Sequence, residues 1–498
     1  MTDSSIRYVG MDVHKRVVEI CIVEHRGKVL RRERFALNRS ALRSFATAVL
    51  RPSDHVALEV TTNCWAVADF LRPQVAKVVV SNPMATKAIA QAKVKTDKVD
   101  AHVLAQLLRC DFLPAVWQPD EATRRLRELC GRRSALVGQR TKMRNRIHSV
   151  LAVRLIEAPL RLFNAEGLDW LAGVEIDPQG RLLLDSDLRQ LQSLEKEIAA
   201  VDNEVVQHAY ARDAVKLLMT LPGIDVTTAT AIMAAWGDPQ RFPDGDHAAS
   251  NLGLVPSTKQ SAEHCYHGPI TKQGNTLARW LLIEAAQHLD KHPGPLGHFF
   301  RRLLKKKNRN VAVVAAARKL AVIGWKLVTR GEPYRYAIPR STEAKLSRLR
   351  VRATGERRKS RAPQGAQCAA KLPGSSRTSK PLAEVCQAEG LPPPPPLSPG
   401  EQRTVEQSGC QGFLAQIALA QVVLRSPAAR RSAAPAAAVP ATAAPAARAT
   451  PRAARAAASR RARSAPETPE EAGPANGTTT GSSSLFRSRR RRDGHDRG

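Results

Sequence analysis

The sequence lacks the marks of a secreted, disulfide-built or membrane protein. Its 498 residues contain no uninterrupted apolar run of 18, so we expect no transmembrane helix. The N-terminus has neither the apolar core nor the small-residue cleavage site of a signal peptide. Eight cysteines are scattered with no Cys-x-x-Cys pair, which leaves a disulfide framework and a structural zinc site poorly supported.

Acidic residues are also scarce relative to basic ones. The chain has 78 Lys and Arg against 45 Asp and Glu, a formal charge of +33. A field of this strength attracts polyanions, and in a chain without a membrane span it favours nucleic acid as the partner. Residues 1–340 carry +17 and residues 341–498 carry +16, so half of the excess lies in the last third. The length predicts two or three domains.

Residues 1–115 predict an α/β domain. The first three strands form an antiparallel meander, and later strands alternate with helices, which is typical of a mixed sheet flanked by helices. Helical spacing appears at residues 40–50 and 64–71, and again between 84 and 109. The expected strands cover residues 7–13, 17–23, 29–35, 55–61 and 75–81.

The rest of the chain predicts a helical linker, a second domain and a tail. Residues 116–213 contain long helices at about 119–155 and 184–210, which suit a coiled-coil linker or oligomerisation element. Residues 214–340 predict a mainly helical domain with a polar loop at 257–274. Residues 341–498 include five consecutive prolines and an alanine-rich stretch. Few large apolar side chains remain there, so we expect a disordered Arg/Ala/Pro-rich tail.

Four carboxylates lie where the predicted fold brings them together. Asp12 and Glu59 stand near the ends of the first and fourth strands. Adjacent strands lie about 4.8 Å apart, so the two acids share one pocket if these strands are neighbours in the sheet. Asp97 and Asp100 share one face at the start of a helix. Such a cluster repels itself unless cations neutralise it, and its oxygen ligands suit a pair of Mg²⁺ or Mn²⁺ ions that assist phosphoryl transfer. The alternative is that Asp97 caps the helix while the other acids form ion pairs.

Residues 218–236 have the form of a helix-hairpin-helix. Gly223 permits a tight turn, and the second helix offers its N-terminal amides to a phosphate. Plain packing of two helices is an equally open interpretation. Lys272 and Arg279 are candidates for holding phosphates, with solvated surface charge as the alternative. Ser261, in the polar loop, is not singled out by residue chemistry alone.

Together these residues resemble the IS110-family transposases, also called DEDD recombinases, over roughly residues 6–338. In the first region the matching motifs are GMDVHK at 10–15, Glu59, Asn82-Pro83 and KTDKVDA at 95–101. In the second region they are LPGI at 221–224, GLVP at 253–256, Gln260-Ser261, and KQGN at 272–275 followed by Arg279. A chance match to two separated blocks in the right order is remote.

The resemblance implies a RuvC-like, RNase H-like fold for residues 1–115 and a transposase domain at 214–340. It implies that Asp12, Glu59, Asp97 and Asp100 bind Mg²⁺, and that Ser261 attacks DNA to form a covalent phosphoserine link. It further implies donor and target DNA, a structured guide RNA, a homo-oligomer such as a dimer or tetramer, and a nucleoid-associated place in the bacterial cytoplasm. The candidate nucleic-acid contacts are Lys15, Lys95, Gly223, Lys272, Asn275, Arg279, Arg301 and Arg302.

Two other functions remain open from the sequence. A RuvC-like nuclease would use the same metal ions to activate water, with Ser261 only packing a loop, and its products would carry free ends. An inactive transposase remnant would bind nucleic acid tightly and in a salt-sensitive way, with no metal-dependent cleavage.

Overall fold

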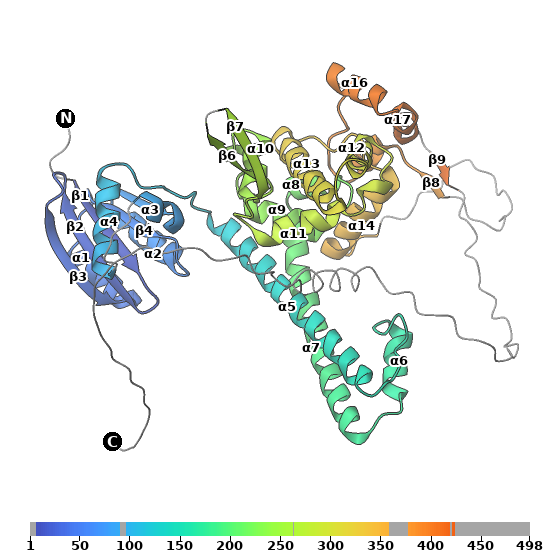
Figure 1. Ribbon diagram of the computed structural model, residues 1–498, viewed down its shortest axis with the longest axis horizontal. Helices are drawn as coiled ribbons and strands as arrows, with labels where there is room; N and C mark the ends of the chain where they lie inside the picture. The colour runs from blue at the N-terminus through green and yellow to red at the C-terminus, as the bar shows by residue number, and fades with distance from the viewer. Residues whose placement is uncertain (1–5, 90–95, 262, 358–376, 419–420, 424–498) are drawn as a thin grey trace, which may run out of the picture. The chain divides into compact units, whose positions relative to one another are not determined.

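The computed structural model describes residues 6–89, 96–261, 263–357, 377–418 and 421–423. Its N-terminal part contains a mixed sheet with the strand order β3-β2-β1-β4-β5 (Figure 1). The strands are β1 (Arg7–Val13), β2 (Val17–Glu24), β3 (Val29–Ala36), β4 (His55–Glu59) and β5 (Lys77–Ser81). The first three are antiparallel, whereas β4 runs parallel to β1 and to β5. The predicted mixed sheet is confirmed.

Helices cover both faces of this sheet. They are α1 (Arg39–Ala48), α2 (Cys64–Leu71), α3 (Pro83–Ile89) and α4 (Asp97–Arg109), with a 3-10 helix at Arg72–Gln74. Val9 and Met11 of β1 pack with residues of α1 and α2 into one core. On the other face, Ala57 of β4 packs against Leu104 of α4. Because successive strand residues point to opposite faces, every second residue of β1 and β4 faces α4.

A long antiparallel pair of helices follows the sheet. The elements are α5 (Glu121–Ala152), α6 (Ala165–Gly173) and α7 (Pro178–Tyr210). Figure 1 shows α5 and α7 side by side, with α6 in the connection between them. The side chains of Asp120 and Asp177 accept backbone hydrogen bonds at the starts of α5 and α7, which satisfies otherwise unpaired amides. Both predicted long helices are confirmed.

Residues 213–354 build a helical body around one apolar core, in which Trp236 and Phe300 are among the largest fully buried side chains. Its first helices are α8 (Asp213–Met219), α9 (Val226–Trp236), α10 (Gly245–Asn251) and α11 (Thr276–Ala286). Its later helices are α12 (Pro295–Leu304), α13 (Arg309–Arg330) and α14 (Pro339–Thr354). Two 3-10 helices, Pro239–Arg241 and Leu289–Lys291, lie in the connections.

The polar loop predicted at residues 257–274 is wrong for most of its length. An antiparallel hairpin of β6 (Pro256–Ser261) and β7 (His264–Ile270) occupies this segment. Most of its side chains are exposed on both faces. A strand with two solvated faces has no apolar alternation, and this explains why the sequence pattern read as a loop.

The disordered tail predicted from residue 341 is wrong for residues 341–357 and for much of 377–418. Helix α14 buries Leu346 and Leu349 in the same core that receives Leu382 and Cys386. The further elements are α15 (Leu382–Ala388), α16 (Pro399–Gln407), α17 (Gln411–Ala418) and the short strands β8 (Arg377–Ser379) and β9 (Gln421–Val423). The prediction used the composition of residues 341–498 as a whole, which is rich in Ala and Pro, and it therefore missed these few apolar positions.

The remaining part of the predicted tail, 358–376, 419–420 and 424–498, lies outside the described residues. Within the ranges given above, no helix combines the length and the apolar character that a membrane span requires.

Candidate active site

Asp12 lies on the sheet face that α4 covers. Met11 is buried on the opposite face, so its neighbours Gly10 and Asp12 point toward α4. A Cβ atom on Gly10 would lie 1.9 Å from the carbonyl oxygen of Ala101. Only glycine therefore allows α4 to pack this closely on β1. The contact places the first turn of α4 beside the end of β1.

Glu59 lies next to Asp12 in the sheet. In the parallel register Met11 pairs with Leu58, so the residues that follow, Asp12 and Glu59, stand at the carboxyl ends of neighbouring strands. Strands in a sheet are about 4.8 Å apart. Glu59 also pairs with Ser81 of β5. The condition on which the sequence argument depended, that the first and fourth strands are adjacent, is met by this register.

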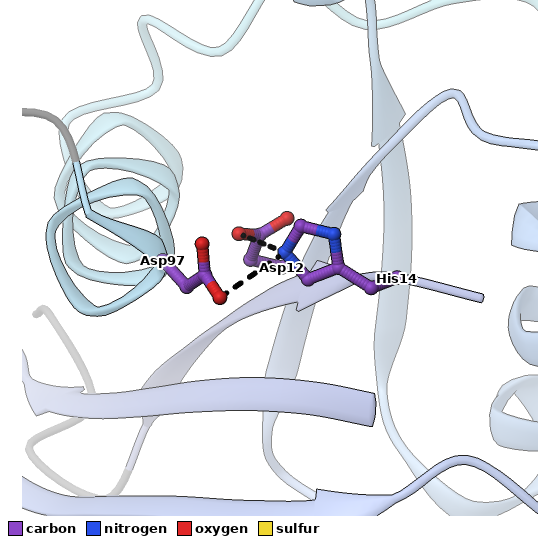
Figure 2. A group of neighbouring side chains, drawn as sticks. All are labelled: Asp12, His14 and Asp97. Carbon is purple, nitrogen blue, oxygen red and sulfur yellow. Dashed lines mark hydrogen bonds and ion pairs between the residues drawn. The ribbon is translucent and has the colours of Figure 1, made fainter. Parts of the chain in front are cut away.

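Figure 2 shows one ring nitrogen of His14 directed toward the carboxylates of both Asp12 and Asp97. The Nε2 atom of His14 is 3.1 Å from Oδ2 of Asp12 and 3.4 Å from Oδ2 of Asp97. One potential ligand atom from each of the three residues lies within 4.8 Å of the others. Asp97 and Asp100 both stand in the first turn of α4, which begins at Asp97 as predicted. The partial positive charge of a helix N-terminus favours carboxylates there.

The electrostatics of Asp12 reflect this crowding. Burial raises the pKa of the Asp12 carboxyl, and the negative charges of Asp97 and Asp100 raise it further, while His14 opposes the rise. A carboxylate whose charged form is disfavoured by burial and by like charges is stabilised when a cation binds.

The donor set fits a divalent cation. Carboxylate oxygens suit Mg²⁺ and Mn²⁺, and an imidazole nitrogen is a better ligand for Mn²⁺ than for Mg²⁺. The structure brings together Asp12, His14 and Asp97 directly. Glu59 lies on the neighbouring strand, and Asp100 is close enough for its charge to raise the pKa of Asp12. Neither belongs to the group of ligand atoms that lie within 4.8 Å of one another.

His14 is the site residue that sequence reasoning missed. Residues two apart in an extended chain share a face, so His14 follows Asp12 to the same side of the sheet. That i, i+2 spacing in the GMDVHK motif is the signal that would have found it.

Replacing Gly10 by alanine should separate the acids. The added methyl group would collide with the backbone of α4, and overpacking of this kind costs about 1–3 kcal/mol. We expect a lower Tm by circular dichroism and weaker Mn²⁺ binding by calorimetry. Gly131→Ala on α5 is the control, because nothing lies within 4 Å of its added Cβ. Wild-type Tm and Mn²⁺ affinity in Gly10→Ala would contradict this account of the packing.

Ser261 lies at the tip of the β6–β7 hairpin. Ser261 ends β6, His264 begins β7, and the two are partners in the antiparallel register. Side chains directly opposite each other lie on one face with Cβ atoms about 4.5–5.5 Å apart. Both residues are exposed, so the serine hydroxyl is open to a large substrate and has an imidazole beside it.

The base of this hairpin is fixed by close backbone contacts. Gly274 has a φ of +103°, and a Cβ atom there would lie 2.0 Å from the carbonyl oxygen of Asn251. Arg279 donates a hydrogen bond to the carbonyl oxygen of Leu252 at 3.0 Å. The amide of Lys272 donates a hydrogen bond to the carbonyl oxygen of Gly253 at 3.2 Å. The GLVP and KQGN motifs therefore meet in space at the base of the hairpin that carries Ser261.

Two family models match the chain. One, described as Transposase (DEDD_Tnp_IS110), matches residues 9–154, and the other, described as Transposase IS116/IS110/IS902 family, matches residues 215–300. The chain belongs to the IS110 family of transposases. The first match contains the four acids of the site, and the second contains Ser261.

Relatives with transposase names cover much of the same length. A protein of Pseudomonas aeruginosa named "Probable family 20 transposase" is 28% identical over 344 residues, which cover 66% of this chain and 98% of that protein. The transposase for insertion sequence element IS1328 of Yersinia enterocolitica is 25% identical, with coverage of 66% and 98%. The transposase for IS1111A of Coxiella burnetii is 25% identical, with coverage of 66% and 92%.

In this transposase, Lys345 of α14 secures the turn between α8 and α9. Its Nζ donates hydrogen bonds to the carbonyl oxygens of Leu221 at 2.7 Å and Ile224 at 3.0 Å. Gly223, between them, has a φ of +75°, and a Cβ atom there would lie 2.5 Å from the carbonyl oxygen of Ala285. The backbone conformation and the close packing explain why a glycine stands at position 223. Phosphate binding by Gly223 stays a prediction.

The stability of the transposase should depend on the ionisation of Lys345. Burial lowers the pKa of Lys345 to about 7 from 10.5, with Asp225 opposing the shift. Between these values the unfolded chain holds a proton that the folded protein has released, so stability rises with pH across that window. We expect the Tm to rise by a few degrees from pH 7 to pH 9.5.

The matched variants isolate this lysine. Lys345→Met should show a smaller rise in Tm across the same pH range, whereas the exposed Lys305→Met should keep the wild-type slope. Equal slopes in the wild type and Lys345→Met, measured by circular dichroism, would contradict the assignment.

Some predicted nucleic-acid contacts of the transposase have structural partners. The Nη1 atom of Arg301 donates hydrogen bonds to the carbonyl oxygens of Asp290 and His292 at 2.8 and 2.9 Å. The side chain of Asn275 caps α11 by accepting a hydrogen bond from the amide of Ala278 at 2.9 Å. For these two residues, as for Arg279, the contacts fix the fold of the domain.

Other predicted contacts are open to solvent. Lys15, Lys272 and Arg302 are exposed, and the guanidinium of Arg302 lies 5.8 Å from the ring centre of Phe299. Lys95 lies outside the described residues. The exposed set remains available for phosphates, and its role stays a prediction.

Proposed function

We propose that this transposase cleaves and rejoins DNA with a RuvC-like, RNase H-type acid site and a serine nucleophile. The observation that carries the proposal is the convergence of Asp12, His14 and Asp97 within 4.8 Å in a chain of the IS110 family. Support for the fold comes from the mixed sheet, in which the acids lie at the carboxyl ends of adjacent parallel strands and on the covering helix.

The acids would hold the divalent ions of this site. Asp12, Glu59, Asp97 and Asp100 are the proposed ligands, and His14 is poised to join them. When bound, two such ions would supply positive charge for the attacking and leaving oxygens of a phosphodiester. Asp12 would be an anchor ligand, because burial in the sheet fixes its position.

Ser261 would be the nucleophile. Its Oγ forms a bond to phosphorus, the bond from phosphorus to one sugar oxygen breaks, and that oxygen departs with a proton. The hydroxyl proton of the serine passes to a base, for which His264 is the cross-strand neighbour. The hydroxyl of a second DNA end then attacks phosphorus and releases the serine, so the bond energy is retained throughout.

The proposal includes a structured RNA that pairs with donor and target DNA. A formal charge of +33 supports binding to more than one polyanion. It also includes a homo-oligomer, a dimer or tetramer, in which the acids of one subunit meet the serine of another. Near α6 in the sequence, Leu155, Leu160 and Leu182 are 94%, 107% and 66% exposed, and contact with a second copy would cover these apolar side chains.

A water-using nuclease is the second candidate. The observation that favours it is that the acid cluster lies in one family-matched region while Ser261 lies in another. An acid site of this composition would be sufficient for hydrolysis by an activated water molecule.

The products distinguish the candidates. The full chain would be incubated with labelled element-end DNA, the RNA transcribed from the adjoining sequence, and Mg²⁺, and then run on a denaturing gel. A DNA band that shifts back after protease digestion marks the covalent serine ester and supports the recombinase. Free ends alone would support the nuclease, and binding without cleavage under every condition would support the inactive remnant.

A further inference from the structure

A cavity of about 440 Å³ lies between α12, α13, residues 332–336 and α16. One face of α13 forms much of its wall, with Lys319, Ile323, Lys326 and Arg330 at helical spacing. The volume is within the usual range for sites that bind small molecules or parts of larger ones.

The walls of the cavity combine cations with aromatic rings. Arg302, Lys319, Lys326 and Arg330 line it, and none of them forms an ion pair among the residues that the structure describes. The aromatic lining residues are Phe299, which is half-buried, and Tyr334 and Tyr336, which are buried. Unpaired cations attract phosphates, and aromatic faces stack with bases of any sequence.

The acidic residues of the cavity converge on one arginine. Arg335 is 3.4 Å from Glu332 and also pairs with Glu401 of α16. Glu401 is oriented by a capping box with Ser398, in which each satisfies the other's backbone amide. The carboxylate of Glu401 thus holds an arginine that would otherwise be available to a ligand phosphate.

We propose that this cavity binds a nucleotide unit of single-stranded nucleic acid, and that α16 restrains the site from within the chain. The cations would contact phosphates, and the half-buried ring of Phe299 would stack with a base. Glu401, Thr404, Gln407 and Ser408 of α16 line the cavity. Helix α16 also follows the last residue, 300, that either family model matches. The site needs neither the acid cluster nor Ser261.

Crosslinking tests the location. A short single-stranded RNA or DNA carrying 5-iodouracil would be irradiated with the full chain, and the modified peptides identified by mass spectrometry. We expect adducts on Phe299. The double variant Lys326→Glu, Arg330→Glu should lose these adducts and at least about tenfold in affinity, as expected for contacts to phosphates.

A variant with the same change in charge is the control. Lys305→Glu with Lys306→Glu changes two exposed lysines that do not line the cavity, so the cavity adducts should remain. Loss of affinity to the same extent in both double variants, or adducts only elsewhere, would overturn the proposal. Binding of adenosine monophosphate without binding of oligonucleotides would also overturn it, in favour of a free-nucleotide site.

If α16 restrains the site, removing the restraint should raise the affinity for an oligonucleotide. A misfolded variant would lose affinity instead. Glu401→Gln keeps an oxygen for the capping box but loses the charge that pairs with Arg335. We expect it to bind the oligonucleotide about three- to tenfold more tightly at low salt. Glu406→Gln, on the same helix and exposed outside the cavity, should bind like the wild type. Unchanged or weaker binding by Glu401→Gln would contradict the restraint.

Discussion

Replacing Ser261 by alanine is expected to abolish the covalent protein–DNA adduct and reduce recombination by at least about 10⁴-fold. The variant removes the atom that forms the bond to phosphorus in the proposed mechanism. Because Ser261 is exposed at a hairpin tip, the truncation should leave folding and DNA affinity intact. The measurement is the yield of protease-sensitive DNA bands, together with a recombination assay on plasmid substrates.

Ser250→Ala is the matched control for this loss. Ser250 is an exposed residue of α10 in the same family-matched region, and its loss should leave the adduct at the wild-type level. Full recombination by Ser261→Ala would remove the serine from the mechanism. Retained cleavage with free ends would transfer the reaction to the water-using nuclease.

Asp12→Asn should lower DNA cleavage on the order of 10³-fold, because an ion that stabilises charge in phosphoryl transfer is worth several kcal/mol. It should also weaken Mn²⁺ binding, which calorimetry measures without reference to activity. Burial and two neighbouring carboxylates disfavour the charged form of Asp12. Removing that charge should therefore keep or raise the Tm of the metal-free protein, which separates a lost ligand from a lost fold.

Glu33→Gln serves as the control for charge in the same domain. Glu33 lies on β3 and pairs with Arg31, away from the strand ends that carry the acids. This variant should keep wild-type cleavage and Mn²⁺ affinity. Wild-type Mn²⁺ affinity in Asp12→Asn would show that the cluster is not an ion site.

The sheet could be predicted from the sequence because its signals are local. Strands of seven or eight residues with short turns predicted the meander, and β4 follows a helix in the manner of parallel pairing. These signals do not fix which strands are adjacent, and it is the parallel register of β1 and β4 that places Asp12 beside Glu59. The helix start at Asp97 was also local, since Thr96 caps it.

The rest of the site depended on contacts between distant segments. The close approach of α4 to β1 depends on the absence of a side chain at Gly10, which packs against Ala101. The hydrophobic periodicity of the sequence does not indicate that these two residues are in contact. The β6–β7 hairpin was missed because neither of its faces is buried. Likewise, the apolar residues of α14 and α15 are buried by the core of residues 213–354, which is formed by segments distant in the sequence.

The exposed position of the hairpin that carries Ser261 bears on when the protein can cut DNA. Ser261, the proposed nucleophile, lies on a hairpin with most of its side chains exposed, so few neighbouring side chains fix its position. The serine hydroxyl would be oriented for attack only when DNA and the acid site surround it. A single subunit bound to chromosomal DNA would then not cleave it, and cleavage would be confined to the assembled complex.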